Sequence, residues 1–481
     1  MRIVIVGAGI GGLTSALALG RAGHDVVVLE RDATPLPATA DEAFDWARRG
    51  APQVRHSHAM LARLRNTLRD RAPDVLAALL DAGATEIRFT EHLPPTLSDL
   101  EPRPGDDDLV GLACRRTTFE WVLRRAVLRQ SGVELRDGVL VDGLVADRSG
   151  RVCGVAVDGT TIAADLVVDA CGPRSGSRSW LAALGIEEPA ETVNDCEIVY
   201  LSRFYRLHDG VEVPVVTGPV AGDLGYAKFA VFVGDNRTFS ITIAADAHDQ
   251  ELRAGLAEPA AFEAAVSTLP AAVPWRNGSS EPITAVHVMA GLRNRRRTLV
   301  VDGRPVAEGF VAVGDAATAT NPLYGRGCSL AVVHAFALAD AVAAHGDDLV
   351  AVACALDDAG VRDVAPWFRA AVQQDQEAAE VAAIAAGRAE PPPTDGTVDP
   401  RAWAREVLRD GLMPAVRTSP VVFRAFLRWF NLLATPDALM GDAEVMNEVL
   451  RVYADRANRA PEPLVGPATR AEFAAVVAAA R

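Results

Sequence analysis

The first thirty residues restrict the possible folds of this 481-residue chain more than any other segment. A short apolar run at 3–6 (IVIV) leads into GAGIGG, then into a helical pattern at 13–23 and a second apolar run that ends at Glu30. Strand, glycine turn, helix and strand together form one βαβ unit. Because the two strands of such a unit are parallel, the pattern predicts an α/β fold built on a parallel sheet.

The glycines have the spacing of a dinucleotide-binding turn. Gly7 would permit the tight turn, Gly9 would let the backbone approach a pyrophosphate, and Gly12 would let helix and strand pack closely. The first N–H groups of the helix would then face the phosphates. Glu30 lies 30 − 12 = 18 residues after the last glycine, where a carboxylate can accept the hydroxyl groups of a ribose. This combination favours dinucleotide binding over a purely structural glycine turn.

A second segment with the same character follows about three hundred residues later. In FVAVGDAATATNPLYGRGCSLA (310–331), Asp315 ends a predicted strand, and Gly325 and Gly327 precede a helix predicted at 329–345. An NAD site usually continues directly into further βαβ units, which is not the pattern here. The two distant halves fit FAD bound in an extended form.

Changes in residue pattern along the chain predict four segments. Residues 1–185 and 301–350 would be the two parts of a split Rossmann-type FAD-binding domain, with helices at 60–83 and 117–131 in the first part. Residues 186–300 contain strand-like runs that predict an antiparallel-sheet substrate domain. Residues 351–481 would form a helical C-terminal region with a linker at 387–400.

Composition excludes several classes of function. The 48 Lys+Arg against 63 Asp+Glu give a charge of 48 − 63 = −15, which argues against a nucleic-acid partner. We find no run of about 18 uninterrupted apolar residues and no signal peptide, so we expect no transmembrane segment. Six scattered cysteines without a CxxC pair predict neither a disulfide framework nor a metal site. A cytoplasmic location is therefore expected.

Several ordered motifs resemble one family, the class A FAD-dependent monooxygenases of the para-hydroxybenzoate hydroxylase type. The resemblance spans roughly residues 1–345 and rests on GAGIGG with Glu30, on DACG (169–172), and on GDAATATNPLYGRG (314–327). The segments RRGAPQVRHSH (48–58) and DACGPRSGSRSWLAALG (169–185) are most similar to bacterial polyether epoxidases and related tailoring oxygenases.

The resemblance implies an FAD site on particular residues. Arg31 would lie beside Glu30 at the adenosine ribose, Val141 near adenine, and Arg116 against the FAD chain, with Arg115 as a competing candidate. Asp315 would meet the ribityl group. The complete predicted set is Gly7, Gly9, Gly12, Glu30, Arg31, Gln53, Arg116, Val141, Gly314, Asp315, Pro322, Gly325 and Gly327. The family's DG motif is replaced here by DACG, which puts direct reduction by a nicotinamide in question.

The implied reaction inserts one oxygen atom from O2 into a large apolar natural-product substrate, by epoxidation or hydroxylation, through a flavin C4a-hydroperoxide. NADH, NADPH or a partner flavin reductase would supply electrons, and a carrier protein is a further candidate partner. The alternatives are an FAD-dependent reductase or desaturase of the geranylgeranyl reductase type, or a non-catalytic flavin-binding protein. A flavin halogenase is disfavoured because the WxWxIP motif is absent and Lys228 lies outside the expected segment.

The sequence identifies no catalytic side chain. His56 and His58 lie in the segment that would run near the flavin, and we interpret them as structural rather than as acid–base catalysts or metal ligands. Gln53 in the same segment is a candidate hydrogen-bond donor to the flavin. An aromatic stripe at 420–440 is interpreted as core, with a cap over an apolar pocket, a carrier contact or a membrane contact as alternatives.

Overall fold

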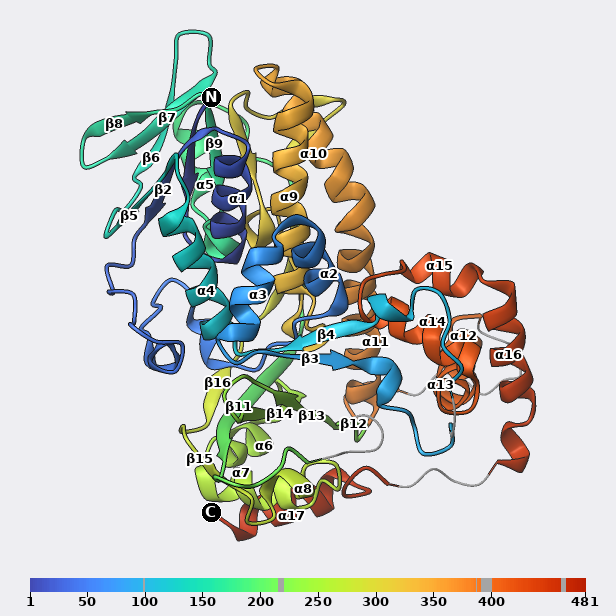
Figure 1. The fold of residues 1–481 in the computed structure, drawn as a ribbon. Helices are drawn as coiled ribbons and strands as arrows, with labels where there is room; N and C mark the ends of the chain where they lie inside the picture. The colour runs from blue at the N-terminus through green and yellow to red at the C-terminus, as the bar shows by residue number, and fades with distance from the viewer. Residues whose placement is uncertain (98–99, 215–219, 386, 391–399, 460–463) are drawn as a thin grey trace.

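The computed structural model describes residues 1–97, 100–214, 220–385, 387–390, 400–459 and 464–481 (Figure 1). Most of the linker predicted at 387–400 lies outside the described residues. The N-terminal and C-terminal ends lie at opposite ends of the view in Figure 1.

A five-stranded parallel sheet forms the centre of the first unit. Its order is β20-β9-β1-β2-β5. The strands are β1 (Arg2–Val6), β2 (Asp25–Glu30), β5 (Val133–Asp137), β9 (Leu166–Asp169) and β20 (Phe310–Ala312). Because β20 pairs with β9 from more than 140 residues away, the predicted split Rossmann-type domain is confirmed.

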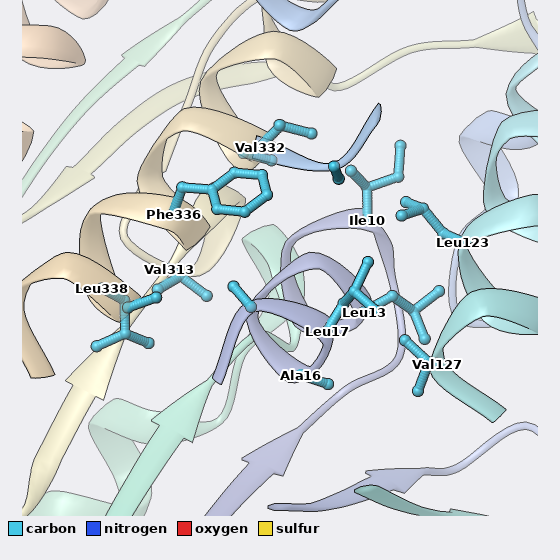
Figure 2. Packing of buried hydrophobic residues seen from close by; sticks show 14 of the residues in the cluster. Ile10, Leu13, Ala16, Leu17, Leu123, Val127, Val313, Val332, Phe336 and Leu338 are labelled. Carbon is cyan, nitrogen blue, oxygen red and sulfur yellow. The ribbon is translucent and has the colours of Figure 1, made fainter. Parts of the chain in front are cut away.

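Helices cover one face of this sheet and enclose its core. They are α1 (Ile10–Arg21), α2 (Ala62–Arg71), α3 (Pro73–Asp81), α4 (Arg116–Arg129), α9 (Gly327–His345) and α10 (Leu349–Asp363). Figure 2 shows side chains of α1, among them Leu13 and Leu17, between Phe336 of α9 and Val127 of α4. Among the described helices, only α9 is long and apolar enough to cross a membrane, and 72% of its apolar window is buried.

The opposite face of the sheet carries smaller elements. An antiparallel sheet of β6 (Gly143–Ala146), β7 (Val152–Val157) and β8 (Thr160–Ala163) packs there with α5 (Ser177–Ala183). A two-stranded sheet of β3 (Thr85–Arg88) and β4 (Val110–Ala113), for which the sequence offered no prediction, precedes α4.

The predicted antiparallel sheet forms the second unit. Its order is β12-β13-β14-β11-β15, and β16 also pairs with β11. The strands are β11 (Ile198–Leu207), β12 (Ala221–Asp223), β13 (Ala227–Val233), β14 (Thr238–Asp246), β15 (Ser280–Pro282) and β16 (His287–Met289). Four helices cover one face of this sheet: α6 (Gln250–Leu256), α7 (Pro259–Ser267), α8 (Val273–Arg276) and α17 (Arg470–Ala479). The sequence did not predict α6, α7 or α8.

Short strands connect the two units. β10 (Glu191–Asp195), β17 (Arg293–Arg297) and β21 (Thr318–Ala319) form one antiparallel sheet. β18 (Val300–Val301) and β19 (Arg304–Pro305) form a hairpin beside α10. Because β21 follows β20 directly, the first of these sheets links the end of the parallel sheet to the second unit.

The rest of the C-terminal region is helical, as predicted. It contains α11 (Ala365–Ala385), α12 (Pro400–Val407), α13 (Met413–Thr418), α14 (Pro420–Phe430), α15 (Pro436–Gly441) and α16 (Ala443–Ala454). From the aromatic stripe, Phe423 and Leu427 of α14 are buried in the core of this region, whereas Phe430 is 39% exposed. The core interpretation therefore holds for the buried part of the stripe.

Candidate functional site

The three glycines of the first turn divide into two structural roles. Gly7 has φ +105°, and a Cβ there would come within 2.6 Å of the Ala170 carbonyl oxygen; a Cβ on Gly12 would overlap the Gly7 carbonyl oxygen. Both glycines are therefore required by packing inside the protein. Gly9, in contrast, would meet no atom within 4 Å, and it lines a cleft at the start of α1. Only a ligand in the cleft would need Gly9 to lack a side chain.

Glu30 lies at the end of β2, inside a group of buried charges. Its Oε2 accepts a hydrogen bond from the Ala8 N–H (2.9 Å), and its Oε1 accepts one from the Asp32 N–H (3.0 Å). Arg48 lies 3.5 Å from Glu30 Oε2 and donates to Glu120 Oε1 at 2.5 Å. Each carboxylate oxygen has two lone pairs, so Glu30 can still accept ribose hydroxyl groups. Arg48 neutralises this acidic group, and the sequence did not single it out.

The sequence left open whether Arg115 or Arg116 contacts a bound cofactor, and the structure distinguishes the two. Arg115 is buried and forms a two-point pair with Asp235, with Nε and Nη2 at 3.1 and 2.7 Å from Oδ2. It does not line the cleft. Arg116 does, and its Nη2 lies 3.7 Å from Glu120 Oε2, while its Nε is buried without a hydrogen-bond partner. Arg116 is therefore the arginine available to a ligand.

One end of the cleft is mainly apolar. Val141 lines it as predicted, together with Arg31. The sequence analysis did not identify Leu140, which is 62% exposed, or Trp180 of α5, although both line the same end. A flat aromatic ring among aliphatic side chains suits the ring of a purine base.

The DACG segment borders this end of the cleft. The carboxylate of Asp169 accepts a hydrogen bond from the Cys171 N–H (3.0 Å) and another from the Ser175 hydroxyl, which holds the turn after β9. Cys171 donates its thiol to the Val6 carbonyl at 3.3 Å, and burial, together with the negative charge of Asp169, raises the pKa of that thiol. A thiol that stays protonated is a poor nucleophile, so Cys171 acts as a small packing residue.

The other end of the cleft is formed by the turn between β20 and α9. Gly314, Asp315, Pro322 and Gly327 line it, and so does Gly325, whose φ is +63°. Burial raises the pKa of Asp315, partly offset by the charge of Arg116. No hydrogen bond to the Asp315 carboxylate occurs among the described residues. Asp315 is partly buried and lines the cleft, so its carboxylate oxygens are available to accept hydrogen bonds from a ligand.

A buried polar group holds this turn against α11. The Asp375 carboxylate accepts hydrogen bonds from the side-chain amides of Asn294 and Asn321 at 2.7 Å each and from the Tyr324 hydroxyl at 3.2 Å. The Tyr200 hydroxyl in turn donates to the Asn321 amide oxygen. These contacts join β17, the turn, α11 and the second sheet, so they fix the position of the turn relative to the sheet.

The segment 53–58 lies between the two units. Gln53, His56 and His58 line the cleft. His58 Nδ1 lies 2.9 Å from the His56 carbonyl oxygen, and burial together with the charge of Arg116 lowers the pKa of His58 to about 3. Burial lowers the pKa of His56 to about 4, with a smaller contribution in the same direction from the charge of His287. Both rings are therefore neutral at neutral pH.

The structure brings together nearly all the predicted residues. Of the thirteen, only Gly12 does not line the cleft, because it packs beneath the turn. The twelve that line it are Gly7, Gly9, Glu30, Arg31, Gln53, Arg116, Val141, Gly314, Asp315, Pro322, Gly325 and Gly327. No group of three His, Cys, Asp or Glu side chains suited to a metal ion occurs in the described part of the chain.

The fold and the cleft together define a class of fold: a Rossmann-type unit with a split parallel sheet and a cleft at its glycine turn, joined to a second, antiparallel sheet. Residues 5–66 match the family model of the NAD(P)-binding Rossmann-like domain. Within this class, the chain has the fold of PqsL from Pseudomonas aeruginosa, described as a probable FAD-dependent monooxygenase. The TM-score is 0.57 and the identity 18%, over 79% of this chain and 96% of PqsL.

Two curated proteins are similar over most of the chain. Protein Rv3254 of Mycobacterium tuberculosis is 28% identical over 464 residues, which cover 89% of each chain. The FAD-dependent urate hydroxylase of Mycolicibacterium vanbaalenii is 26% identical over 378 residues, 75% of this chain and 84% of the hydroxylase.

Proposed function

We propose that this protein is an FAD-dependent monooxygenase that inserts one oxygen atom from O2 into a small-molecule substrate. The observation that carries the proposal is the cleft: one surface contains an open Gly9, the carboxylate of Glu30, and Asp315, which has no hydrogen-bond donor among the described residues. The similarity to proteins named as FAD-dependent oxygenases supports the same activity.

The polar atoms around the cleft fit FAD. The N-terminal turn of α1 begins at Gly9 and offers free N–H groups and a positive dipole end to a pyrophosphate. In the described part of the chain, Arg116 Nε and Thr320 Oγ1 are buried at the cleft without hydrogen-bond partners. Such groups are costly to bury alone, and a ligand rich in hydroxyl and phosphate groups would satisfy them.

In this arrangement each part of the cofactor has its own residues. Trp180 and Val141 would hold the adenine, Glu30 the adenosine ribose, Gly9 the pyrophosphate, and Asp315 the ribityl hydroxyl groups. The flavin ring would lie at the start of α9, beside the turn containing Pro322 and Gly325.

Bound FAD would, once reduced, activate O2 for transfer of one oxygen atom. The overall reaction takes a substrate, O2, two electrons and two protons to an oxygenated product and water. NADH, NADPH or a partner flavin reductase would supply the electrons. The protein's part is to position the substrate at the flavin and to exclude water from it.

The motifs shared with polyether epoxidases favour a large apolar natural product as substrate, oxygenated by epoxidation or hydroxylation. The reductase or desaturase and the non-catalytic flavoprotein are the competing functions. Purified FAD-loaded protein should be reduced, exposed to ¹⁸O2 in an extract of the source cells, and analysed by mass spectrometry. A product heavier by one ¹⁸O atom, formed with steady O2 uptake, is expected.

Other outcomes of this experiment point to other functions. Anaerobic turnover with loss or gain of two hydrogen atoms would instead support the reductase or desaturase. An FAD absorption band that no reductant bleaches would support a non-catalytic flavoprotein.

Arg116 is predicted to contribute to FAD affinity. Because it also pairs with the buried Glu120, the thermal unfolding curve of the variant is compared with that of the wild type. In Arg116→Met the aliphatic part of the side chain is kept and the charge is lost, so the dissociation constant for FAD should rise about 10-fold to 100-fold. Fluorescence titration of the apoprotein with FAD measures this. Arg136→Met, at an exposed ion pair, serves as the control. Equal affinities in the two variants would remove Arg116 from the site.

Asp315 is predicted to bind the ribityl end. Asp315→Ala should weaken FAD binding by about 1–3 kcal/mol, because a hydrogen bond to a charged carboxylate is lost. Titration with FAD and with ADP separates the two ends of the site: the affinity for ADP, which has no ribityl group, should not change. A parallel loss of ADP binding would show that the substitution disturbs the cleft as a whole.

A further inference from the structure

Four hydroxyl side chains form a continuous hydrogen-bonded chain that ends at His56; three of them are buried, and Ser57 is partly buried and lines the cleft. His56 Nδ1 lies 3.1 Å from Ser202 Oγ, and Ser202 Oγ lies 2.7 Å from Thr242 Oγ1. Ser57 Oγ then lies 2.7 Å from both Thr242 Oγ1 and Ser240 Oγ. β11 and β14 place Ser202, Thr242 and Ser240 on one face of the second sheet, since Ser202 pairs with Thr242 and Phe204 with Ser240.

The direction of this chain can reverse. A hydroxyl group both donates and accepts, and each of the three inner hydroxyls has two neighbours in the chain. If His56 carries its proton on Nδ1, the hydroxyls donate away from the ring and Nε2 is an acceptor. If the hydroxyls donate toward the ring, Nδ1 accepts and the proton sits on Nε2, which becomes a donor. The ring stays neutral in both states.

The free side of the ring faces the cleft. His56 is 7% exposed, and its Nε2 has no hydrogen-bond partner among the described residues, whereas Nδ1 is bonded to the chain. The ring lies beside His287 of β16, with 6.3 Å between centroids. The neighbouring segment reaches the turn at the start of α9, because a Cβ on Gly325 would lie 2.8 Å from the Ala59 Cβ. Nε2 is thus a free polar atom at the flavin end of the cleft.

We propose that His56 binds an oxygen-bearing group of the substrate at the flavin end of the cleft, accepting from a hydroxyl or donating to a carbonyl as the hydroxyl chain reverses. Naming the ligand as the substrate rests on the proposed function, whereas the binding site itself does not. The proposal replaces our sequence-based interpretation of His56 as structural, and it narrows the predicted large apolar substrate to one that carries a hydroxyl or carbonyl group. A site built to bind a hydroxyl or carbonyl group discriminates strongly against an analogue that lacks it.

Two pairs of small aromatic probes test the site. Phenol is compared with toluene, and acetophenone with isopropylbenzene, by titration into FAD-loaded protein while the flavin absorption spectrum is followed. The ¹⁵N and ¹H signals of the His56 ring are recorded by NMR in the same titrations. The variants are His56→Phe and Ser202→Ala, with Ser15→Ala as control because Ser15 has a buried hydroxyl without a partner and does not line the cleft.

The oxygenated probe of each pair should bind at least about 10-fold more tightly than its hydrocarbon partner and should shift the His56 signals. His56→Phe should abolish this preference, Ser202→Ala should reduce it, and Ser15→Ala should leave it unchanged. Any of three results would overturn the proposal. The first is equal binding of the two probes of each pair, the second is an undiminished preference for the oxygenated probe in both His56→Phe and Ser202→Ala, and the third is the absence of a shift of the His56 signals at saturating probe. If the protein retains no FAD, the proposed function fails, while the NMR titrations still test the site.

Discussion

Replacing Gly9 by valine is expected to leave a folded protein that retains no FAD. The backbone of Gly9 is extended, with φ −80° and ψ −174°, which a valine can adopt, and a Cβ there would meet no protein atom within 4 Å. The new side chain would instead occupy the space in which a pyrophosphate approaches the backbone. We expect the dissociation constant for FAD to rise more than about 100-fold, which corresponds to about 2.7 kcal/mol or more.

The measurement is the visible absorption of the purified variant after dialysis against FAD, together with its thermal unfolding curve. Gly143→Val is the matched control, since Gly143 in β6 also has no atom within 4 Å of its Cβ position and does not line the cleft. Gly12→Ala should behave in the opposite way and unfold more easily, because its Cβ would overlap the Gly7 carbonyl oxygen. A yellow, FAD-saturated Gly9→Val protein would contradict the assignment of this turn.

Asp235→Ala is expected to lower the free energy of unfolding by about 3–5 kcal/mol, because it leaves the buried guanidinium of Arg115 with only the more distant and largely exposed Asp41, at 3.7 Å. Asp235 accepts hydrogen bonds from the Arg115 side chain, from the Arg115 backbone N–H (2.6 Å) and from the Thr118 hydroxyl (2.7 Å). These bonds connect the start of α4 to the turn before β14. The variant should therefore loosen the junction of the two units.

The same pair has a predictable pH dependence. Burial opposes ionisation of Asp235, but the hydrogen bonds and charge of Arg115 outweigh it, so the pKa of Asp235 is lowered. A carboxylate with a lowered folded-state pKa stabilises the protein above its unfolded-state pKa of about 3.9, and this contribution is lost as the pH falls through the folded-state value. The difference between wild type and Asp235→Ala should thus be largest near neutral pH and shrink below about pH 4.

Urea unfolding at several pH values measures both effects. Glu134→Ala is the control, because Glu134 and Arg136 form an exposed pair that should contribute little. An unchanged free energy of unfolding in Asp235→Ala would mean that the buried pair is not needed to join α4 to the second sheet.

The local part of the site could be predicted from the sequence because its signals are local. The apolar run of β1, the glycines after it and the helical periodicity of α1 lie within about twenty residues, and each reflects a backbone requirement. The acidic end of β2 and the motif around Asp315 follow from the same kind of pattern. These features predicted the split parallel sheet, and together with the family resemblance they predicted twelve of the residues that line the cleft.

The partners of buried charges could not be predicted in this way. Nothing near Arg48 in the sequence indicates Glu120, 72 residues later, and nothing near Arg115 indicates Asp235, 120 residues later. The choice between Arg115 and Arg116 therefore needed the structure. Arg115 precedes α4 with an extended backbone (φ −66°, ψ 145°), whereas Arg116 is the first residue of the helix, and their side chains contact different parts of the protein: Arg115 pairs with Asp235 and Arg116 lines the cleft.

The sequence by itself determined that a Rossmann-type unit forms and where its nucleotide turn lies, because glycine geometry and apolar periodicity act over a few residues. The tertiary structure alone decided which polar groups meet where the cleft borders the second sheet. His56, Ser57, Ser202, Ser240 and Thr242 are ordinary residues in three separate segments. Pairing of β11 with β14, and packing of the 53–58 segment on that sheet, bring them into one hydrogen-bonded chain. Burial favours such a chain, since a hydroxyl removed from water costs free energy unless it finds a partner.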